Sequence, residues 1–327
     1  MTGSTPLRIL LSPDAQRQTA AGLHRALDGR AHTLVTLGED ADVAFVSRDV
    51  TGLSTKNSVL PHTKAFHDSL RNAASLRWVH AHSAGADRPV YGELRARGVE
   101  VTTSSGANAG VVVQSALAGV LMLARQFPQL LAAQRARTWA PLIGATPPRD
   151  LAGQTAVVVG WGPIGQGLGA LLAALGLRVV AVRGSNAPAA APSHHSVPFE
   201  RLHEVLPQAD WLLLACPLSE RTRGLVDAAA LGLLPAGARL VNVARGEVVD
   251  EPALIAALQA GALAGAFLDV FANEPLLPAS PLWELPNVIV TPHTAGHSDG
   301  NEGRVAAIFL DNLRRWCAGE ALVNRVA

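Results

Sequence analysis

Short hydrophobic runs alternate with amphipathic, helix-like segments along the whole chain. Five such runs predict strands in the first third: LRILLS (7–12), HTLVTL (32–37), DVAFVS (42–47), LRWVHAHS (76–83) and VEVTTS (99–104). Six more follow: TAVVVG (155–160), RVVAVR (178–183), WLLLAC (211–216), RLVNVA (239–244), GAFLDV (265–270) and NVIVTP (287–292). Strands that alternate with helices favour parallel sheets of the α/β class.

Two longer segments have the length and periodicity of helices. The apolar stretch 109–125 predicts a helix between the two groups of strands. The segment 302–318 predicts an amphipathic helix, because five apolar side chains recur on one face. They are Val305, Ile308, Phe309, Leu313 and Trp316. Since only some thirty residues follow the last strand, we expect this helix to return to the first group of strands.

A glycine-rich turn joins the strand TAVVV to the apolar helix QGLGALLAALG. Gly160, Gly162 and Gly165 match the pattern G-x-G-x-x-G in the strand–turn–helix context that the mechanism needs. The first glycine permits a tight turn, the second lets the backbone approach a pyrophosphate, and the third lets the helix pack on the strand. The helix N-terminus supplies amide hydrogens to the anion. The plainer interpretation is a turn that only connects two elements; the context favours a dinucleotide site.

Because this motif lies in mid-chain, about a hundred residues form a separate unit before it. We predict an α/β fold with two Rossmann-like or flavodoxin-like parallel-sheet domains. The nucleotide-binding domain, 106–294, is inserted in a split substrate-binding domain, 1–105 plus 295–327. The two chain crossings, near Ser105 and Thr294, are expected to form a hinge.

Composition narrows the class of protein. A chain of 327 residues and 34.0 kDa is long for one core, which agrees with two domains. A net charge of +1 argues against a broad surface for nucleic acid or for a membrane. Two cysteines, Cys216 and Cys317, cannot form a disulfide framework and favour the cytoplasm. The N-terminus lacks the basic lead-in of a signal peptide, and apolar segments such as 111–123 are short for a membrane span.

Arg183 ends the second strand of the nucleotide domain, where a ribose-binding carboxylate is expected. A carboxylate there would repel the 2′-phosphate of NADP, whereas a guanidinium pairs with phosphate through its planar fork. Ser185 and Asn186 add neutral donors. The sequence therefore predicts NADP as the preferred cofactor, with NAD possible if Arg183 only faces solvent.

Three polar residues follow the ends of later strands: Arg245, Glu274 and His293. The carboxyl ends of parallel strands meet at the ligand crevice, so we expect these side chains to be neighbours. Arginine holds the carboxylate of a 2-keto acid and polarises its carbonyl. Histidine donates a proton as hydride arrives, and glutamate orients the imidazole. Each residue alone is better explained by a turn, an exposed loop or a backbone contact, whereas the three together favour this chemistry.

These residues lie in blocks that resemble the D-isomer-specific 2-hydroxyacid dehydrogenase family. The blocks are NVARGEVVDEPALIAALQAG, GAFLDVFANEP, LPNVIVTPHTAG, GWGPIG and SAGAD, in the order and spacing of the family. The resemblance implies that Arg245, Glu274 and His293 form the catalytic triad and that Asp269 engages the nicotinamide carboxamide. It assigns the substrate carboxylate to the backbone amides of Ala84 and Gly85, and it implies a homodimer. Arg183 in place of aspartate resembles the glyoxylate and hydroxypyruvate reductases that prefer NADPH.

Other positions carry weaker predictions. Further contacts to the cofactor are expected from Pro163, Ile164, Cys216, Pro217, Thr222, Val243 and Ala244. Cys216, at the end of an apolar strand, is interpreted as a buried packing residue and not as a nucleophile. Arg48, after the third strand, is a candidate reader of a distal polar group on the substrate. Trp139 lies in a stretch that reaches a partner subunit's site in some members of the family, and packing in the core or on the surface explains it equally well. His194 and His195 are interpreted as part of a solvated loop, and no metal site is predicted.

The leading interpretation is an NAD(P)H-dependent oxidoreductase that reduces small 2-keto acids, such as glyoxylate or hydroxypyruvate, to D-2-hydroxy acids. His293 is its general acid and base. A second interpretation is a dinucleotide-sensing scaffold with the same fold and no turnover. A third keeps hydride transfer but oxidises another small anion, such as phosphite. Retention of Arg245, Glu274 and His293 favours an enzyme.

Overall fold

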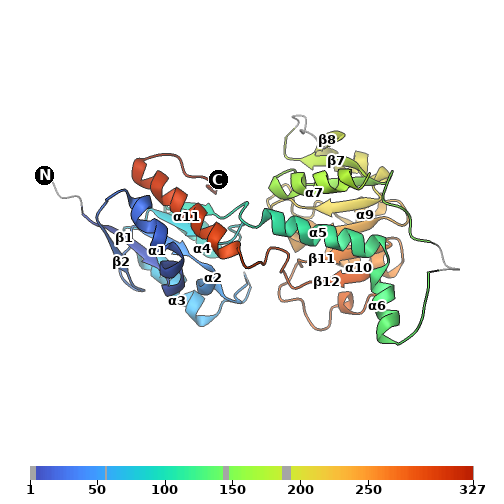
Figure 1. Ribbon diagram of the computed structural model, residues 1–327, viewed down its shortest axis with the longest axis horizontal. Helices are drawn as coiled ribbons and strands as arrows, with labels where there is room; N and C mark the ends of the chain where they lie inside the picture. Colours follow the sequence, from blue (N-terminus) through green and yellow to red (C-terminus); the bar gives the residue numbers. More distant parts are fainter. Residues whose placement is uncertain (1–4, 56, 143–146, 186–192, 327) are drawn as a thin grey trace. The chain divides into compact units, whose positions relative to one another are not determined.

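A computed structural model of the chain describes residues 5–55, 57–142, 147–185 and 193–326. The chain divides into two compact units (Figure 1). Unit 1 joins the first 108 residues to the segment from Ser298 onward, and unit 2 is the continuous segment Ala109–His297. One unit is thus inserted in the sequence of the other.

Unit 1 is built on a parallel sheet of five strands in the order β2-β1-β3-β4-β5. Its strands are β1 (Leu7–Leu11), β2 (His32–Val35), β3 (Val43–Val46), β4 (Trp78–Ala81) and β5 (Glu100–Thr103). Its helices are α1 (Pro13–Leu27), α2 (Arg48–Thr51), α3 (Pro61–Asn72), α4 (Pro89–Ala96) and α11 (Asn301–Ala318). This strand order is the flavodoxin-like form of the doubly wound fold.

The C-terminal segment completes unit 1. Helix α11 lies beside α1 (Figure 1), and Gly22 of α1 packs so closely on Leu310 that a Cβ there would lie 2.4 Å from Cδ1. Beyond α11, the N–H of Val326 donates to the carbonyl of Val101. The C-terminal segment thus pairs with the edge strand β5. The expectation that the last helix returns to the first group of strands is therefore confirmed.

Unit 2 contains a parallel sheet of seven strands in the order β12-β11-β10-β9-β6-β7-β8. The strands are β6 (Thr155–Val159), β7 (Arg178–Arg183), β8 (His195–Pro198), β9 (Trp211–Leu214), β10 (Arg239–Asn242), β11 (Gly265–Leu268) and β12 (Val288–Val290). The α-helices are α5 (Ala109–Ala124), α6 (Phe127–Arg135), α7 (Pro163–Ala174), α8 (Leu202–Val205), α9 (Ala228–Gly232) and α10 (Glu251–Gln259). Short 3₁₀ turns are η1 (Phe199–Arg201), η2 (Leu206–Gln208), η3 (Gly246–Val248) and η4 (Pro281–Trp283). The order is that of a Rossmann sheet with one further strand.

Both faces of the seven-stranded sheet are buried. In β6, Val157 and Val159 pack in one apolar core, whereas Ala156 and Val158 pack in a second core on the opposite face. A strand covered on both sides reads as a continuous apolar run instead of an alternating one, which explains TAVVV. The predicted class, two parallel-sheet α/β domains, is confirmed.

All eleven predicted strands are present in the structure, but among the described residues one further strand was missed. Strand β8 lies at the edge of the sheet, and the interpretation of His195 as part of a solvated loop is wrong because this residue begins β8. His194, just before it, accepts the N–H of Val179 at its Nδ1 (3.1 Å). A short edge strand with exposed polar residues carries no hydrophobic run, so the sequence pattern could not reveal it.

No described helix is by itself long and apolar enough to cross a membrane; only α5 and α6 taken together, across a bend of 72°, reach the length and composition of a span.

Candidate functional site

The glycine-rich turn between β6 and α7 is packed from two sides. Gly160 has a φ of +99°, a conformation that favours glycine, and a Cβ there would lie 2.5 Å from the backbone nitrogen of Cys216. At Gly165 a Cβ would lie 1.9 Å from the carbonyl oxygen of Gly160. These two glycines are therefore needed for the turn itself.

Gly162 differs from its two neighbours in the motif. It is the N-cap residue of α7, and a Cβ there would meet no described atom within 4 Å. Pro163, exposed, and Ile164, half-buried, open the twelve-residue helix. The N-terminus of α7 thus lies just beyond the carboxyl end of β6, and the helix dipole there favours an anion.

Arg183 lies at the carboxyl end of β7, two strands from β9 and next to β8. It is half-buried, is in register with Pro198 of β8, and is followed by the exposed Ser185. Asn186 lies outside the described residues. Arg183 therefore occupies the strand-end position at which the ribose of a dinucleotide is expected.

Arg245, Glu274 and His293 follow three adjacent parallel strands. β10, β11 and β12 are neighbours in the sheet, and each of these residues comes shortly after the carboxyl end of one strand. Parallel strands end at the same edge of a sheet, so the three segments start from one side of unit 2.

Close backbone packing ties the first segment to the second. A Cβ on Gly246 would lie 1.8 Å from the carbonyl carbon of Phe271, so the residue after Arg245 touches the backbone that leads to Glu274. The N–H of Phe271 donates to Glu274 Oε1 (3.1 Å), and the N–H of Ala272 donates to Oε2 of Glu251 in α10 (3.0 Å). The Arg-Gly step and the glutamate are thus built into one framework.

A hydrogen bond ties the second segment to the third. Nδ1 of His293 lies 2.8 Å from Oε2 of Glu274. The carboxylate is largely buried, at 17% side-chain exposure, whereas the imidazole is 48% exposed. Since Glu274 engages Nδ1, Nε2 is the ring nitrogen left to exchange a proton with a reactant. This is the arrangement of an oriented acid–base histidine.

Asp269 holds the turn that carries His293. Its side chain is 2% exposed and accepts hydrogen bonds from the hydroxyl of Thr291 (2.6 Å) and from the N–H groups of Thr294 (2.9 Å) and Ala295 (3.0 Å). Its carbonyl accepts the N–H of His293 (2.8 Å). His293 itself has a φ of +53°, a left-handed backbone conformation that few non-glycine residues adopt.

We expect Asp269→Asn to disturb this turn. The asparagine amide places N–H groups among backbone donors, which leaves buried groups unpaired and costs about 1–3 kcal/mol of unfolding free energy. With the imidazole less well fixed, kcat is expected to fall about tenfold. Denaturant unfolding and steady-state kinetics measure the two effects.

Asp227→Ala is the matched control for that change. Asp227 accepts the N–H of Ala230 at the start of α9, and its loss costs about 1 kcal/mol without touching the turn. If Asp269→Asn lowers kcat no more than Asp227→Ala does, then the Asp269 carboxylate contributes only to stability.

The other residues predicted to contact the cofactor lie around the strand ends. Cys216, Val243 and Ala244 are buried in the apolar cores, and burial raises the pKa of the Cys216 thiol to about 12. The hydroxyl of Thr222 accepts the N–H of Ser219 and donates to the carbonyl of Pro217, which closes the loop after β9.

The loop predicted to bind the substrate carboxylate belongs to unit 1 and follows β4. The hydroxyl of Ser83 donates to the carbonyl of Gly85 (2.6 Å) and folds the loop, and Ala84 is exposed. The N–H of Ser104 donates to the carbonyl of Ser83, which fixes the base of the loop. Arg48 begins the short helix α2 after β3, at the same edge of the five-stranded sheet.

His80 supports that loop from inside the core. It is fully buried in β4, and its ring nitrogens lie 2.8 Å from Thr102 Oγ1 and 3.0 Å from Ser104 Oγ. Burial lowers the pKa of His80 to about 3, so the imidazole is neutral at ordinary pH. A neutral ring with both nitrogens bonded is a structural group.

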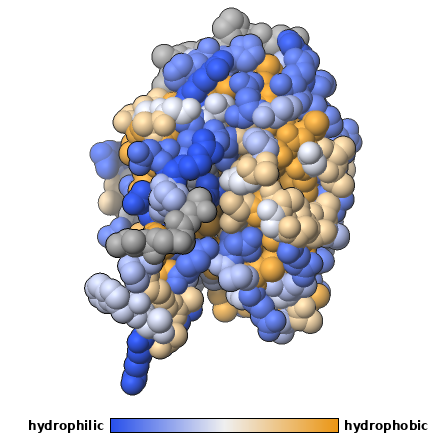
Figure 2. Space-filling view, turned by 90° about the vertical axis from the view of Figure 1, so that its right-hand side faces the viewer, coloured by the Kyte–Doolittle hydropathy of each residue, from blue (hydrophilic) through white to orange (hydrophobic). Residues whose placement is uncertain are grey.

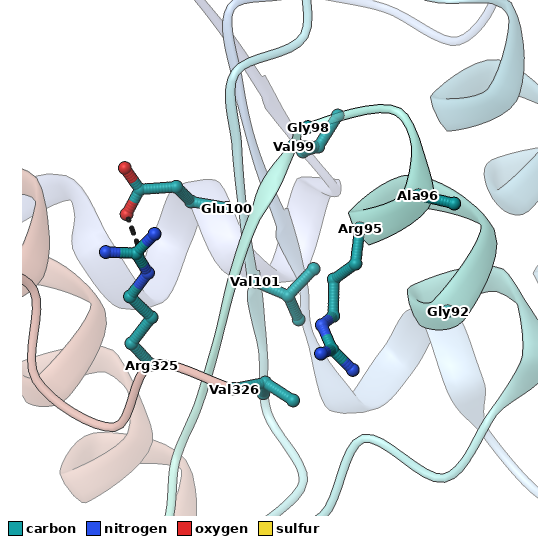
Figure 3. A pocket seen from close by; sticks show the side chains of 9 residues that line it. All are labelled: Gly92, Arg95, Ala96, Gly98, Val99, Glu100, Val101, Arg325 and Val326. Atoms are coloured by element: carbon teal, nitrogen blue, oxygen red, sulfur yellow. Dashed lines mark ion pairs between the residues drawn. The ribbon is translucent and has the colours of Figure 1, made fainter.

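A separate hollow lies in unit 1 between α4, β5 and the C-terminal segment (Figure 3). Figure 3 shows the guanidinium of Arg325 turned toward the carboxylate of Glu100, with Nε and Oε2 3.7 Å apart. The other residues that line this hollow are glycines, an alanine, valines and Arg95. The lining includes no residue of the glycine turn and none of the strand-end residues of unit 2. Across the described ranges of the chain, no group of three or more His, Cys, Asp or Glu side chains is arranged to hold a metal ion.

Sequence reasoning missed the residues that support the site. Asn242, buried at the end of β10, accepts the N–H of Ala244 and donates to the carbonyl of Arg245. In the same way, the hydroxyl of Thr291 donates to the carboxylate of Asp269, and the carboxylate of Glu251 accepts the N–H of Ala272. An asparagine inside the apolar run RLVNVA was the available signal, since a buried polar side chain needs a partner.

Comparison with known proteins agrees with this architecture. Residues 117–295 match the family model for the D-isomer specific 2-hydroxyacid dehydrogenase, NAD binding domain. The chain belongs to this dehydrogenase family. Over 301 residues it is 32% identical to the D-3-phosphoglycerate dehydrogenase of Mycobacterium leprae, which covers 90% of this chain and 56% of that protein. The chain thus spans about half the length of the first curated relatives it matches.

Other members of the family are similar over most of both chains. Glyoxylate reductase of Thermococcus gammatolerans is 32% identical, with 85% of this chain and 84% of that protein covered. A family member from Xanthobacter autotrophicus Py2, solved with NADPH and MES, is 30% identical at a TM-score of 0.77, with 99% and 98% covered. The NADPH-dependent glyoxylate/hydroxypyruvate reductase of Sinorhizobium meliloti, solved with NADP and malonate, is 27% identical at a TM-score of 0.74, with 99% and 97% covered.

Proposed function

We propose that this protein is an NADP-preferring D-2-hydroxyacid dehydrogenase that reduces small 2-keto acids such as glyoxylate or hydroxypyruvate. The observation that carries the proposal is the hydrogen bond between Nδ1 of His293 and Glu274, on strand ends adjacent to the segment of Arg245. Membership of the family supports the same reaction. Relatives with the activity of glyoxylate reductase support the substrate class.

Each residue has a distinct task in this reaction. NADPH, when bound, would supply the hydride that the carbonyl carbon of the substrate accepts. The oxygen then gains negative charge and takes a proton from Nε2 of His293, while Glu274 stabilises the imidazolium and fixes the ring. Arg245 pairs with the substrate carboxylate and polarises the carbonyl. In the oxidation direction the same imidazole accepts the hydroxyl proton.

Further residues are assigned to binding. We assign the pyrophosphate to the turn Gly160–Gly165 and the N-terminus of α7, and the nicotinamide carboxamide to Asp269. The backbone amides of Ala84 and Gly85 are assigned to the substrate carboxylate, and Arg48 to a distal group on the substrate. The cofactor is NADP, because Arg183 stands where a carboxylate would otherwise hold the ribose hydroxyls of NAD.

Loss of NADPH absorbance with a panel of 2-keto acids tests the reaction. We expect turnover with glyoxylate or hydroxypyruvate, with kcat between about 1 and 10³ s⁻¹. A second assay offers phosphite and NADP and follows the appearance of NADPH. It detects oxidation of an anion other than a 2-hydroxy acid. Tight NADPH binding without turnover of any substrate would contradict the proposal and favour a sensing scaffold.

We also propose a cytoplasmic homodimer. Helix α6 buries none of its side chains, and apolar residues are exposed along α5, α6 and the segment after them: Leu121, Phe127 and Trp139, the last 94% exposed. Figure 2 shows one face of the molecule, on which hydrophobic side chains gather in patches between hydrophilic ones. A second copy of the chain is the proposed occupant of the surface formed by α5, α6 and the segment after them.

We expect a solution mass near twice 34.0 kDa by light scattering; a mass near 34.0 kDa would contradict the homodimer.

A further inference from the structure

A second arginine reaches the end of β7 from a distant part of the sequence. Arg221 lies in the loop after β9, whereas Arg183 ends β7, and β6 with its glycine turn lies between these strands in the sheet. Nη1 of Arg221 donates to the carbonyl of Gly184 (3.0 Å), the residue directly after Arg183. The Arg221 side chain therefore spans from β9 to β7 at the carboxyl edge where a dinucleotide binds.

Two residues that follow β8 hold the guanidinium of Arg221. Its Cζ lies 5.4 Å from the centre of the Phe199 ring, a cation–π distance. Its Nε and Nη2 donate to Oε1 of Glu200 at 3.1 and 2.7 Å. Phe199 and Glu200 come directly after Pro198, which is in register with Arg183. The position of Arg221 is thus fixed relative to the end of β7.

The guanidinium still has capacity for an anion. The hydrogen bonds to Gly184 and Glu200 use one N–H on each nitrogen, which leaves one on Nη1 and one on Nη2 without a partner among the described residues. The pair with Glu200 is half exposed, at 50% and 62%, and such pairs contribute little. A phosphate monoester carries more charge than a carboxylate and accepts a bidentate fork.

We propose that Arg221 is a specificity-determining residue that binds the 2′-phosphate of NADP together with Arg183, and that Glu200 competes with this phosphate for the guanidinium. The inference rests on the proposed use of NADP. It adds a cation from the β9 loop to the ribose end of the site. In this proposal the Glu200 carboxylate weakens the preference of the protein for NADP over NAD.

Binding of two cofactor fragments tests the proposal without turnover. Adenosine 2′,5′-bisphosphate carries the 2′-phosphate, and AMP lacks it. For Arg221→Gln in the full chain, we expect the Kd of the bisphosphate to rise at least tenfold by calorimetry, with the Kd of AMP changed less than twofold. Arg223→Gln is the matched control, because Arg223 is exposed in the same loop and is expected to leave both values within twofold.

Glu200→Gln tests the competition in the opposite direction. Removal of the competing charge is expected to lower the Kd of the bisphosphate about threefold and to leave that of AMP unchanged. Weaker binding of the bisphosphate by this variant would overturn the competition with Glu200.

The outcomes separate this inference from the proposed function. Equal loss of both fragments in Arg221→Gln would show that Arg221 only positions Gly184, and no loss of either would remove it from the site; both overturn the inference. In either case, the proposed preference for NADP still stands if the wild type binds the bisphosphate more tightly than AMP and Arg183→Asp abolishes that difference. A wild type that binds both fragments equally contradicts the cofactor preference itself.

Discussion

Replacement of His293 by glutamine is expected to lower kcat for 2-keto acid reduction by about 10³-fold, within the range that a positioned general acid contributes. The reason is that Nε2 of the ring, oriented by Glu274 at Nδ1, is the proposed proton donor to the developing alkoxide. Glutamine keeps polarity and approximate size but does not titrate. The loss corresponds to about 4 kcal/mol of transition-state stabilisation.

Two measurements separate this effect from damage to the fold. The Kd for NADPH, from quenching of protein fluorescence, is expected to change less than threefold, since the imidazole acts on the substrate. His203→Gln, an exposed histidine of α8 in the same unit, is the matched control and is expected to keep full activity. A His293→Gln enzyme that retains more than a tenth of wild-type kcat would refute the role of this residue as acid.

Replacement of Arg183 by aspartate is expected to reduce kcat/KM with NADPH by about 10²- to 10³-fold relative to NADH. The change removes the proposed charge-assisted hydrogen bond to the 2′-phosphate, worth about 1.5–3 kcal/mol, and adds repulsion between a carboxylate and that phosphate. With NADH, the new carboxylate accepts hydrogen bonds from the ribose hydroxyls, so activity with that cofactor is expected to be kept or to rise.

Arg178→Asp is the matched control for this change. Arg178 begins the same strand β7, is exposed, and lies at the amino end of the sheet, away from the cofactor edge. The same reversal of charge there is expected to leave the ratio of NADPH to NADH activity within twofold. If Arg183→Asp lowers kcat/KM equally for both cofactors, Arg183 supports the fold of the strand end and does not bind the phosphate.

The glycine turn and the strand ends could be predicted because their signals are local. TAVVV reads as a strand buried on both faces, and the spacing of Gly160, Gly162 and Gly165 reports a tight turn whatever surrounds it. Arg245 and His293 each stand within a few residues of a strand end, and parallel strands bring such positions to one edge. Periodicity and topology rules therefore suffice to indicate these positions.

The supporting contacts could not be predicted, because they join segments that the chain separates. Asp269 holds the turn at Thr291–Ala295, and Gly246 packs on Phe271, through distances that no local pattern encodes. Arg221 shows the same limit: in the sequence it is one arginine of an exposed loop, and only the sheet order brings it to Gly184.

The sequence by itself therefore determined the α/β class, eleven strands and the positions of Arg245, Glu274 and His293 just beyond three strand ends, because short-range periodicity and strand ends fix these. Tertiary structure alone decided that Glu274 engages Nδ1 of His293, that Asp269 imposes the backbone of that histidine, and that β8 completes the sheet. The physical reason is that hydrogen bonds between distant segments depend on distances of a few tenths of an ångström, which packing sets and sequence spacing does not.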